Sequence, residues 1–593
     1  MTREEINVTV LYGSETGTAQ DTAEELWINA KRNGLKCSVI AMDDYNLEHL
    51  CSERLILFVA STTGQGDTPS NMTNFWRFLL RKSHPQTLLK NLKYAVLGLG
   101  DSSYEKYNFA AKKLNKRLSQ LGAQEMIPIA LADDQHDLGI DATVEPWMKN
   151  IWRIISEVLN IPLKPSHQVI ERFSVSVVPR TDPSVAEFTK KVSADIYEHE
   201  LEVNSHLKFA TIMRNTRTTA LDHFQDVRLI ELNIPNVNYH PGDIIYVRPK
   251  NSPDQVSRFF HLLREHDVPL VPETLLSISD KEIKLPHCLR HPLTLRQVVE
   301  QYWDLNYKPR RSTMQVLALL SDNDLEKEKL TEFSAAAGQD ELYSYVNRPR
   351  RNILEVLGDF PHTTRRLNEK VLFEVMSPIK PRAFSIASSC KSSPGEVHLL
   401  VAVVKYKTKL VEPRLGLCSN WLASLQEGQR VICWLQKGTF KFDWEKPMIF
   451  VGPGTGVAPF RSILLELEAA KVDMKDIILF FGCRSERKDF HCREDCERLV
   501  KNHHLTVFSA FSRDQEDKIY VQHLIREQGA LCWNLLLNGG KIYLSGSSKD
   551  MPKCVREEFV DMARKFGDFN DFEAENFVRN LEKCGRYQTE TWG

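Results

Sequence analysis

Short apolar runs and amphipathic stretches alternate through the first part of the chain. The apolar runs have the length of buried strands, and they cover residues 8–11, 55–60, 94–99 and 125–130. Helical periodicity lies between them, most clearly at residues 21–33 and 107–121. This alternation is typical of a parallel sheet with helices on both faces, so we predict a doubly wound α/β domain over residues 1–158.

The pattern changes after residue 158. Residues 159–205 hold several prolines among polar side chains, which predicts a linker. Strand-like segments then appear at residues 227–233, 244–249, 370–374 and 397–404. Helical segments interrupt them from about residue 252 to 370, at residues 293–302, 313–321 and 325–336. We predict a β-barrel with a helical insertion over residues 206–445.

Strands and helices alternate again over residues 446–593. The candidate strands are residues 448–451, 477–481, 505–511 and 541–544. This segment predicts a second α/β domain, so the fold class is multidomain α/β.

Composition and charge exclude few classes of function. The 593 residues suffice for about three or four domains, and the formal net charge of -1 gives no general reason to expect nucleic acid. The N-terminal residues lack a secretory signal, and no run approaches the roughly 18 apolar residues of a membrane helix. We expect a cytoplasmic monomer without a membrane anchor.

The cysteines predict neither disulfides nor a metal site. The 12 cysteines are scattered without CxxC pairs, as is typical of reduced cytosolic thiols. Cys492 and Cys496 beside His491 have the nearest thing to a metal-binding spacing. The flanking sequence offers no further ligands for a tetrahedral site, so we predict no metal.

A hydroxyl-rich segment joins the first predicted strand to the first predicted helix. It consists of Ser14, Glu15, Thr16, Gly17, Thr18 and Ala19. Hydroxyls and backbone N–H groups at a helix N-terminus can bind a phosphate dianion without a lysine. The segment lacks the Gly-Lys-Ser/Thr ending of a triphosphate loop. Taken alone, it is also compatible with an ordinary helix cap.

Polar loops follow the next two predicted strands. The first loop is Ser61, Thr62, Thr63, Gly64, Gln65, Gly66 and Asp67, and the second is Gly98, Leu99, Gly100, Asp101, Ser102, Ser103 and Tyr104, followed by Glu105, Lys106, Tyr107 and Asn108. Glycines let the backbone approach a planar ring, and Tyr104 can stack on it. Parallel strand ends share one edge of a sheet, so we expect these loops and Asp134 to surround one ligand.

A motif in the strand-rich region favours a second phosphate-bearing cofactor. It consists of Arg382, Ala383, Phe384 and Ser385. A guanidinium suits a pyrophosphate, an aromatic ring packs on a flat cofactor, and a hydroxyl can reach a ring nitrogen. The tetrapeptide is weak evidence alone, but its order and spacing relative to the next motif strengthen it.

A glycine-rich turn opens the last domain. Gly452, Gly454 and Gly456, with Thr455, follow a predicted strand and precede a helix, as in a pyrophosphate-binding turn. A later strand is followed by Ser512, Arg513, Lys518, Ile519, Tyr520, Val521 and Gln522. Cations and hydroxyls in that place favour NADPH over NADH, although a solvated charged turn is the alternative.

In this order the motifs resemble the diflavin reductase family over nearly the whole chain. The resemblance implies a flavodoxin-like FMN domain, a FAD domain and an NADPH domain, in that order. It implies that residues 14–19, 61–64 and 99–108 and Asp134 bind FMN. It also implies that Arg350, the Arg382 motif and a second motif of Gly416, Leu417, Cys418 and Ser419 bind FAD. Thr455 and residues 512–522 are implied to bind NADPH. Electrons then pass from NADPH through FAD and FMN to a one-electron acceptor.

The same resemblance implies four residues that assist hydride transfer. These are Ser385, Ser545, Glu590 and Trp592, of which Trp592 matches an aromatic residue that covers the FAD ring until nicotinamide displaces it. Glu590 and Ser545 stand where the microsomal member has aspartate and cysteine. Thr63 stands where several members have a stacking tyrosine, and Phe384 lacks the common phenolic hydroxyl. We expect these departures to tune rates rather than abolish activity.

Within the family, the chain is similar to the short cytosolic members. The Ser-Thr-Thr-Gly, Arg-Ala-Phe-Ser and Gly-Leu-Cys-Ser segments all agree with them. That similarity implies electron donation to the iron–sulfur protein anamorsin in cytosolic iron–sulfur cluster assembly. Two alternatives are a general reductase of haem proteins or dyes and an interaction scaffold with structural flavins.

Acidic residues cluster beside the expected FMN edge. They are Asp133, Asp134, Asp137, Asp141 and Glu145. Such a surface would steer a basic patch on an electron acceptor. The alternative is a merely solvated acidic loop.

Overall fold

The protein divides into two compact units in a computed structural model that describes residues 7–64, 66–104, 106–160, 162–179 and 195–592. Unit 1 comprises Met1–Val203, Lys250–Lys380 and Lys407–Glu412, and unit 2 comprises Asn204–Pro249, Pro381–Tyr406 and Pro413–Gly593. The helical insertion thus belongs with the N-terminal α/β region and not with the strands that flank it in sequence.

Unit 1 contains the predicted N-terminal parallel sheet. Its strands are β1 (Val8–Gly13), β2 (Cys37–Ala41), β3 (Leu55–Ser61), β4 (Lys93–Gly100), β5 (Gln124–Glu125) and β6 (Ala130–Asp133). The order is β2-β1-β3-β4-β5, with β6 also paired to β4. The strand expected at residues 125–130 is instead two short strands. Pro128 lies between them and has no N–H for the ladder.

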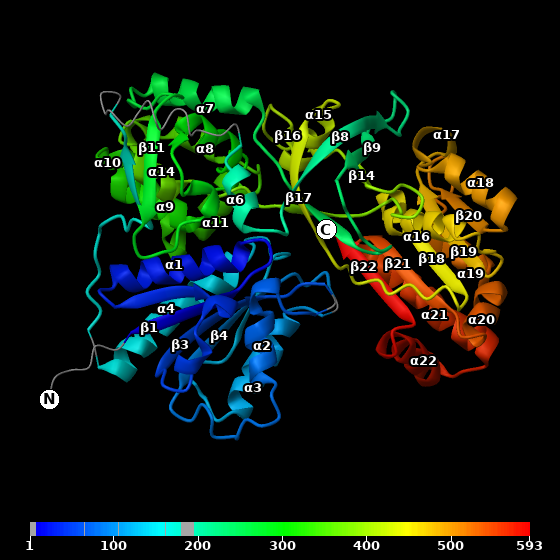
Figure 1. Cartoon of the computed structure of the whole chain (residues 1–593). Helices are drawn as coiled ribbons and strands as arrows, with labels where there is room; N and C mark the ends of the chain where they lie inside the picture. The colour runs from blue at the N-terminus through cyan, green and yellow to red at the C-terminus, as the bar shows by residue number, and fades with distance from the viewer. Residues whose placement is uncertain (1–6, 65, 105, 161, 180–194, 593) are drawn as a thin grey trace. The chain divides into compact units, whose positions relative to one another are not determined.

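Helices cover both faces of this sheet (Figure 1). They are α1 (Thr18–Arg32), α2 (Thr73–Leu79), α3 (Phe109–Gln120) and α4 (Asp141–Leu159). On one face, Phe75 of α2 and Leu114 of α3 join the buried core with Phe58 of β3. Helices α1 and α4 cover the opposite face, which is the face turned toward the helical insertion.

The insertion is mainly helical, as the sequence predicts. Its principal helices are α7 (Pro253–Glu265), α8 (Leu295–Gln301), α9 (Arg311–Leu320), α10 (Asp324–Ser334), α12 (Ile353–Asp359) and α14 (Glu369–Val375). The strand expected at residues 370–374 was wrong, because this segment is α14. The side chain of Asn368 accepts hydrogen bonds from the backbone N–H of Lys370 and Val371 and so starts a helix.

The expected linker is partly structured. Strand β7 (Phe173–Val177) pairs antiparallel with β11 (Leu275–Asp280), which also pairs with β12 (Leu293–Thr294). Helix α6 (Glu198–Val203) follows, and residues 180–194 lie outside the described part of the chain. The alternating burial of β7 shows that a five-residue segment among prolines can still bury one face in a sheet.

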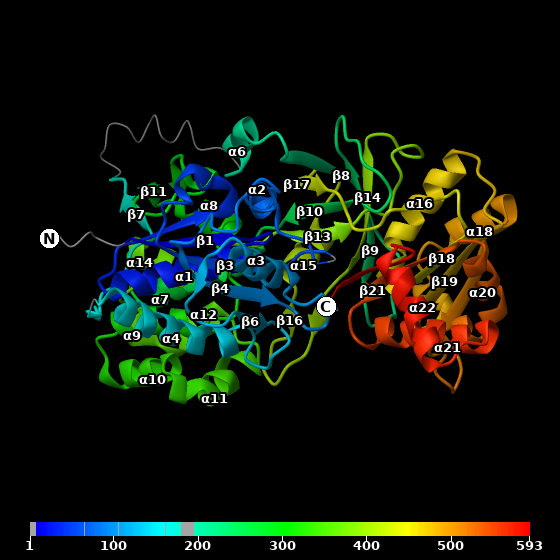
Figure 2. The same cartoon turned by 90° about the horizontal axis from the view of Figure 1, so that it is seen from below.

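Ion pairs join the N-terminal α/β region to the rest of unit 1. Figure 2 shows α9 beside α4, where Arg311 pairs with Glu145 at 2.9 Å. The neighbouring Arg310 pairs with both Asp141 and Glu25. Two residues of the acidic cluster, Asp141 and Glu145, are therefore paired with arginines of the insertion in this structure.

Two further carboxylates pair with Arg172 where the N-terminal α/β region packs on the insertion. Its guanidinium lies 3.0 Å from Glu24 on α1 and 3.0 Å from Glu374 on α14. All three side chains are largely buried. Arg172 therefore ties the segment before β7 to both the sheet region and the insertion.

Unit 2 begins with an antiparallel sheet. Its strands are β8 (Lys208–Arg217), β9 (Val227–Asn233), β10 (Ile244–Arg248), β13 (Arg382–Ser385), β14 (Glu396–Ala402) and β17 (Arg430–Gln436), in the order β13-β10-β17-β8-β9-β14. Just after β13, an isolated bridge joins Ile386 to Leu399 of β14, and the Ala387 N–H donates to the His398 carbonyl. Within the described residues the strands do not form the closed barrel that the sequence led us to expect.

The C-terminal part of unit 2 is the predicted second α/β fold. Its parallel strands are β18 (Met448–Pro453), β19 (Ile477–Cys483), β20 (Thr506–Phe511), β21 (Lys541–Ser547) and β22 (Tyr587–Trp592), in the order β20-β19-β18-β21-β22. Strand β22 was not predicted. Among the described residues, no helix is both long and apolar enough to cross a membrane.

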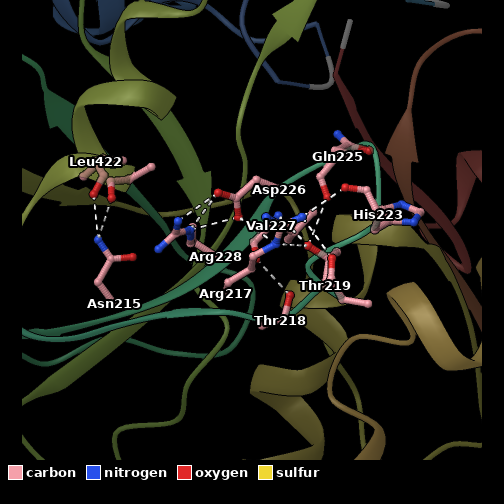
Figure 3. A network of polar contacts seen from close by, with 12 residues as sticks. Asn215, Arg217, Thr218, Thr219, His223, Gln225, Asp226, Val227, Arg228 and Leu422 are labelled. Atoms are coloured by element: carbon pink, nitrogen blue, oxygen red, sulfur yellow. Dashed lines mark hydrogen bonds and ion pairs between the residues drawn. The ribbon is translucent and has the colours of Figure 1, made fainter.

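The loop between β8 and β9 connects the two sheets of unit 2. Figure 3 shows that Asp226 forms ion pairs with Arg228 and Arg217. This holds the loop so that the hydroxyl of Thr218 lies 3.0 Å from Nδ1 of His491, beyond β19. The antiparallel and parallel sheets therefore belong to one compact body.

Candidate functional site

The segment after β1 folds as a phosphate-binding loop should. Gly17 has a φ of 103°, in the left-handed region, and its N–H donates to Ser14 Oγ at 3.1 Å. Asn71 fixes the loop from outside by accepting from the Ser14 N–H at 2.8 Å. Helix α1 starts at Thr18, so the hydroxyls lie at its N-terminus, where the helix dipole favours an anion.

Strand register brings the polar loops together. Gly13 at the end of β1 pairs with Ala60, and Ser61 at the end of β3 pairs with Leu99 on β4. Gly100 pairs in turn with Asp133 on β6. The loops of residues 14–19, 61–64 and 99–108 therefore start side by side at one edge of the sheet. Glu105 within them lies outside the described residues.

Asn108 occupies a strained, buried position in the third loop. Its φ is 56° and its side chain is fully buried, with Nδ2 donating to the Ala132 carbonyl at 3.0 Å. A Cβ on Gly98 or Gly100 would come within 3.0 Å of this side chain, which explains both glycines. Asn108 Oδ1 has no hydrogen-bond partner among the described residues. A bound ligand or a water molecule can supply the donor that this buried acceptor lacks.

The Arg382 and Gly416 motifs lie near one another in unit 2. Arg382–Ser385 forms β13, paired with β10. Gly416 precedes α15 (Leu417–Ser424), and the hydroxyl of Ser419 accepts from the Val404 N–H at 3.0 Å. Burial raises the pKa of the Cys418 thiol to about 12, against the opposing charge of Arg382. Cys418 is therefore a neutral packing residue. Arg350 belongs to unit 1.

The glycine-rich turn after β18 has room for a ligand. Gly454 has a φ of 58°, and a Cβ there would meet no atom within 4 Å. At Gly456 a Cβ would lie 2.2 Å from the Ser545 carbonyl oxygen, so this glycine permits close packing on β21. Thr455 stands between them, before α16 (Ala458–Ala469). The turn thus combines an open side with a tightly packed side.

The loop after β20 presents the expected cationic residues. Backbone hydrogen bonds from Ser512 to the Cys483 carbonyl and from Arg513 to the Arg484 carbonyl fix its start. The side chains of Arg513, Lys518 and Tyr520 are exposed, and Gln522 is half-buried. Val521 is buried and Ile519 packs on the core of the domain, so these two anchor the loop.

The four residues expected to assist hydride transfer include two in direct contact. Ser385 Oγ donates to Glu590 Oε1 at 2.9 Å, and Thr439 Oγ1 donates to the other carboxylate oxygen at 3.2 Å. Ser545 lies opposite Glu590 in the register of β21 and β22. Ser545 is fully buried, and its hydroxyl has no hydrogen-bond partner among the described residues. Burial raises the pKa of Glu590, and the bonds from Ser385 and Thr439 partly offset this.

Trp592 lies two residues beyond Glu590 on the same strand. Side chains at positions i and i+2 of a strand point to the same face, so Trp592 shares the face that meets Ser385. Its backbone carbonyl accepts from the Ser548 N–H at 2.8 Å, which holds the end of β22. The indole is 37% exposed and so lies accessible beside the Glu590 cluster.

Sequence reasoning missed Thr439 and Lys380. Thr439 lies between β17 and β18, in a segment without a motif. Lys380 approaches the phosphate loop from the end of the insertion, with its Nζ 3.2 Å from Thr18 Oγ1. Both contacts join residues more than 100 positions apart, so no local pattern could reveal them.

Comparisons with known proteins match these regions in order. The flavodoxin family model matches residues 10–147, the FAD binding domain model residues 202–421, and the oxidoreductase NAD-binding domain model residues 450–557. They support the predicted cofactors FMN, FAD and NADPH.

Relatives that match over nearly the full length of the chain agree with the family models. The chain is 47% identical to NADPH-dependent diflavin oxidoreductase 1 of Xenopus laevis and 45% identical to that of Danio rerio, in each case over 99% of both chains. It is 36% identical to the protein of the same name in Schizosaccharomyces pombe, again over 99% of both chains. The chain therefore belongs to the NADPH-dependent diflavin oxidoreductases, as the order of its motifs predicted.

Proposed function

We propose that this enzyme passes electrons from NADPH through FAD and FMN to an iron–sulfur protein of the anamorsin type, in cytosolic iron–sulfur cluster assembly. The observation that supports the reductase chemistry most directly is the Glu590 carboxylate held by Ser385 and Thr439. The Ser-Thr-Thr-Gly, Arg-Ala-Phe-Ser and Gly-Leu-Cys-Ser segments support the cytosolic type of acceptor.

The residues that we assign to each cofactor are those that the family resemblance implies. For FMN we assign residues 14–19, 61–64 and 99–108 with Asp134, for FAD Arg350, residues 382–385 and residues 416–419, and for NADPH Thr455 and residues 512–522. Two observations fit a ligand: the Asn108 oxygen without a partner among the described residues, at the FMN loops, and the open side of Gly454, at the NADPH turn. Neither bears on the FAD pyrophosphate site. There the fit rests on the donor set of Arg382 and the N-terminus of α15.

The flavins, when bound, accept a hydride from NADPH and release electrons singly. The chain's own contribution is to orient groups around that step. Ser385 and Thr439 fix the two oxygens of Glu590, and the raised pKa lets this carboxyl hold a proton at higher pH than an ordinary glutamate. The buried Ser545 hydroxyl can donate to or accept from a ligand atom beside it. Trp592 shields this region from water until nicotinamide enters.

Acceptor docking is assigned to the acidic edge near Asp137. Asp137 is exposed, whereas Asp141 and Glu145 are paired with arginines of the insertion. Those two become available to a basic partner only when the contact between α4 and α9 opens. A test of docking must therefore neutralise Asp137 alone, since changing the other two also breaks ion pairs within unit 1.

Stopped-flow reduction with alternative acceptors tests this function. The enzyme is mixed with NADPH and either an anamorsin-type iron–sulfur protein or a haem protein such as cytochrome c. We expect the iron–sulfur protein to be reduced faster, and Asp137→Asn to slow that reduction at low salt while flavin reduction by NADPH stays unchanged. Equal rates with both acceptors would favour a general reductase. No absorbance change on adding NADPH would favour a scaffold.

A further inference from the structure

The charges at the expected FMN phosphate loop do not match those of a phosphate dianion. Its six residues offer hydroxyls and backbone N–H groups but no cation, and the first turn of α1 adds the carboxylate of Asp21. A helix N-terminus attracts a phosphate dianion, but a carboxylate within the same turn opposes it. A bound phosphate would therefore benefit from a cation that the N-terminal α/β region does not place in the loop.

The helical insertion brings such a cation to the loop. Lys380 Nζ lies 2.8 Å from Asp21 Oδ2 and 3.2 Å from Thr18 Oγ1. A Cβ on Gly17 would lie 3.9 Å from Lys380 Cε, so the lysine side chain runs along the loop backbone. The side chains of Lys380 and Asp21 are 26% and 25% exposed, which keeps their charges only partly screened.

We infer that Lys380 binds the 5′-phosphate of FMN together with the hydroxyls of the loop. This inference rests on the proposed assignment of residues 14–19 to that phosphate. The ammonium already hydrogen-bonds the Thr18 hydroxyl at the start of α1. It therefore offsets the charge of Asp21 and adds positive charge where the dianion binds. One FMN ligand then comes from the insertion, more than 350 positions along the chain from the loop.

The alternative is that Lys380 and Asp21 form only a structural ion pair. The two possibilities differ in their dependence on the phosphate group. A phosphate ligand favours FMN over riboflavin, which has the same ring and ribityl chain but no phosphate. A structural pair affects both molecules equally.

The test uses the full-length protein depleted of FMN, titrated with FMN and with riboflavin while flavin fluorescence is recorded. We expect Lys380→Met to weaken FMN binding on the order of tenfold at low salt and to leave riboflavin binding unchanged. Lys380→Arg should retain most of the FMN affinity because it keeps the charge. Asp21→Asn should tighten FMN binding, since it removes the opposing carboxylate.

A matched control comes from the other end of the same helix. Lys31 on α1 forms an ion pair with Glu282 of the insertion, at the far end of α1 from the phosphate loop. Lys31→Met should therefore change neither FMN nor riboflavin binding. Retained FAD content and an unchanged circular dichroism spectrum report that each variant is folded.

Two outcomes would overturn the inference. One is equal weakening of FMN and riboflavin by Lys380→Met, and the other is no weakening of FMN. Thr16→Ala separates this failure from failure of the loop assignment. If Thr16→Ala weakens FMN but not riboflavin while Lys380→Met does not, the loop holds the phosphate without Lys380. If neither variant distinguishes the two flavins, the loop assignment fails as well.

Discussion

Arg311 on α9 and Glu145 on α4 form an ion pair in which the arginine side chain is only 7% exposed. Loss of one partner would leave a buried charge without compensation, which costs about 3 kcal/mol. We therefore predict that Glu145→Gln lowers the free energy of unfolding of unit 1 by about this amount, measured by urea denaturation.

The same helix offers a control for this prediction. Glu157 pairs with Arg153 at 2.6 Å, but both side chains are 60% exposed. Glu157→Gln should change the free energy of unfolding by less than about 0.5 kcal/mol. Similar effects of the two substitutions would show that burial does not decide the strength of the Arg311 pair.

A second prediction concerns the pH dependence of stability. Burial raises the pKa of Glu25 to about 7 from an unperturbed 4.5, with Arg310 opposing the shift and Asp141 and Glu145 adding to it. The folded protein thus binds this proton more tightly than the unfolded chain does. The resulting stabilisation is complete below pH 4.5 and is lost as pH rises through about 7.

Glu25→Gln removes this titration. We predict that the unfolding free energy of the variant, relative to the native protein, rises between about pH 4.5 and 7 and is constant above. Thermal or urea unfolding of both proteins across pH 5 to 8, on the order of half-unit steps, measures the difference. A difference that does not change with pH would contradict the assignment to Glu25.

We predict that substitutions in the Glu590 cluster slow hydride transfer to different degrees. Glu590→Gln removes a carboxyl that accepts two hydrogen bonds and should slow flavin reduction by NADPH about tenfold. Thr439→Val removes one neutral donor and should slow it about threefold, whereas Thr439→Ser should restore the rate. Since burial raises the pKa of Glu590, any pH dependence of this step above the ordinary glutamate range should disappear in Glu590→Gln. A persistent pH dependence would assign it to another group.

We predict that Arg513 decides the preference for NADPH over NADH. Its side chain is exposed at the end of β20, where the backbone is held by Arg484. Arg513→Ala should weaken NADPH binding about tenfold to a hundredfold and leave NADH binding almost unchanged, because only NADPH has the 2′-phosphate. Dissociation constants from flavin-absorbance titrations measure both. Equal losses would place the role of Arg513 elsewhere.

For Trp592 we predict a gain in the use of NADH instead of a loss in the binding of NADPH. If the indole covers the FAD ring, either nicotinamide must displace it, and Trp592→Ala removes a stack worth roughly 1 kcal/mol beyond its buried area. We expect kcat/KM for NADH to rise in this variant. Steady-state kinetics with NADH are sufficient to check it, and an unchanged value would show that Trp592 does not cover the ring.

Local sequence was enough to predict the elements that hold the loops. Strands such as β9 match their expected bounds because apolar alternation is a local property. The strand expected at residues 370–374 failed because Asn368 supplies a helix cap that outweighs the short apolar run. Strand β22 was missed because its residues are mostly polar, and only pairing with β21 makes it a strand.

Residues that act across long separations could not be predicted. Thr439 meets Glu590 only because the sheets of unit 2 belong to one body, and Lys380 meets Thr18 only because the insertion packs on α1. The partners of Asp141 and Glu145 could not be predicted from the sequence for the same reason. A sequence shows where the acids are but not which arginines will face them.

The interleaving of the two units has a consequence for protein synthesis. Glu25, Asp141 and Glu145 lie in the first segment of unit 1, but their partners Arg310 and Arg311 belong to its second segment, after strands of unit 2. On the ribosome, the N-terminal α/β region therefore emerges while the arginines that pair with these three carboxylates are still untranslated. Unit 1 is completed only after the first strands of unit 2 have been translated, so the order of folding cannot follow the order of the chain.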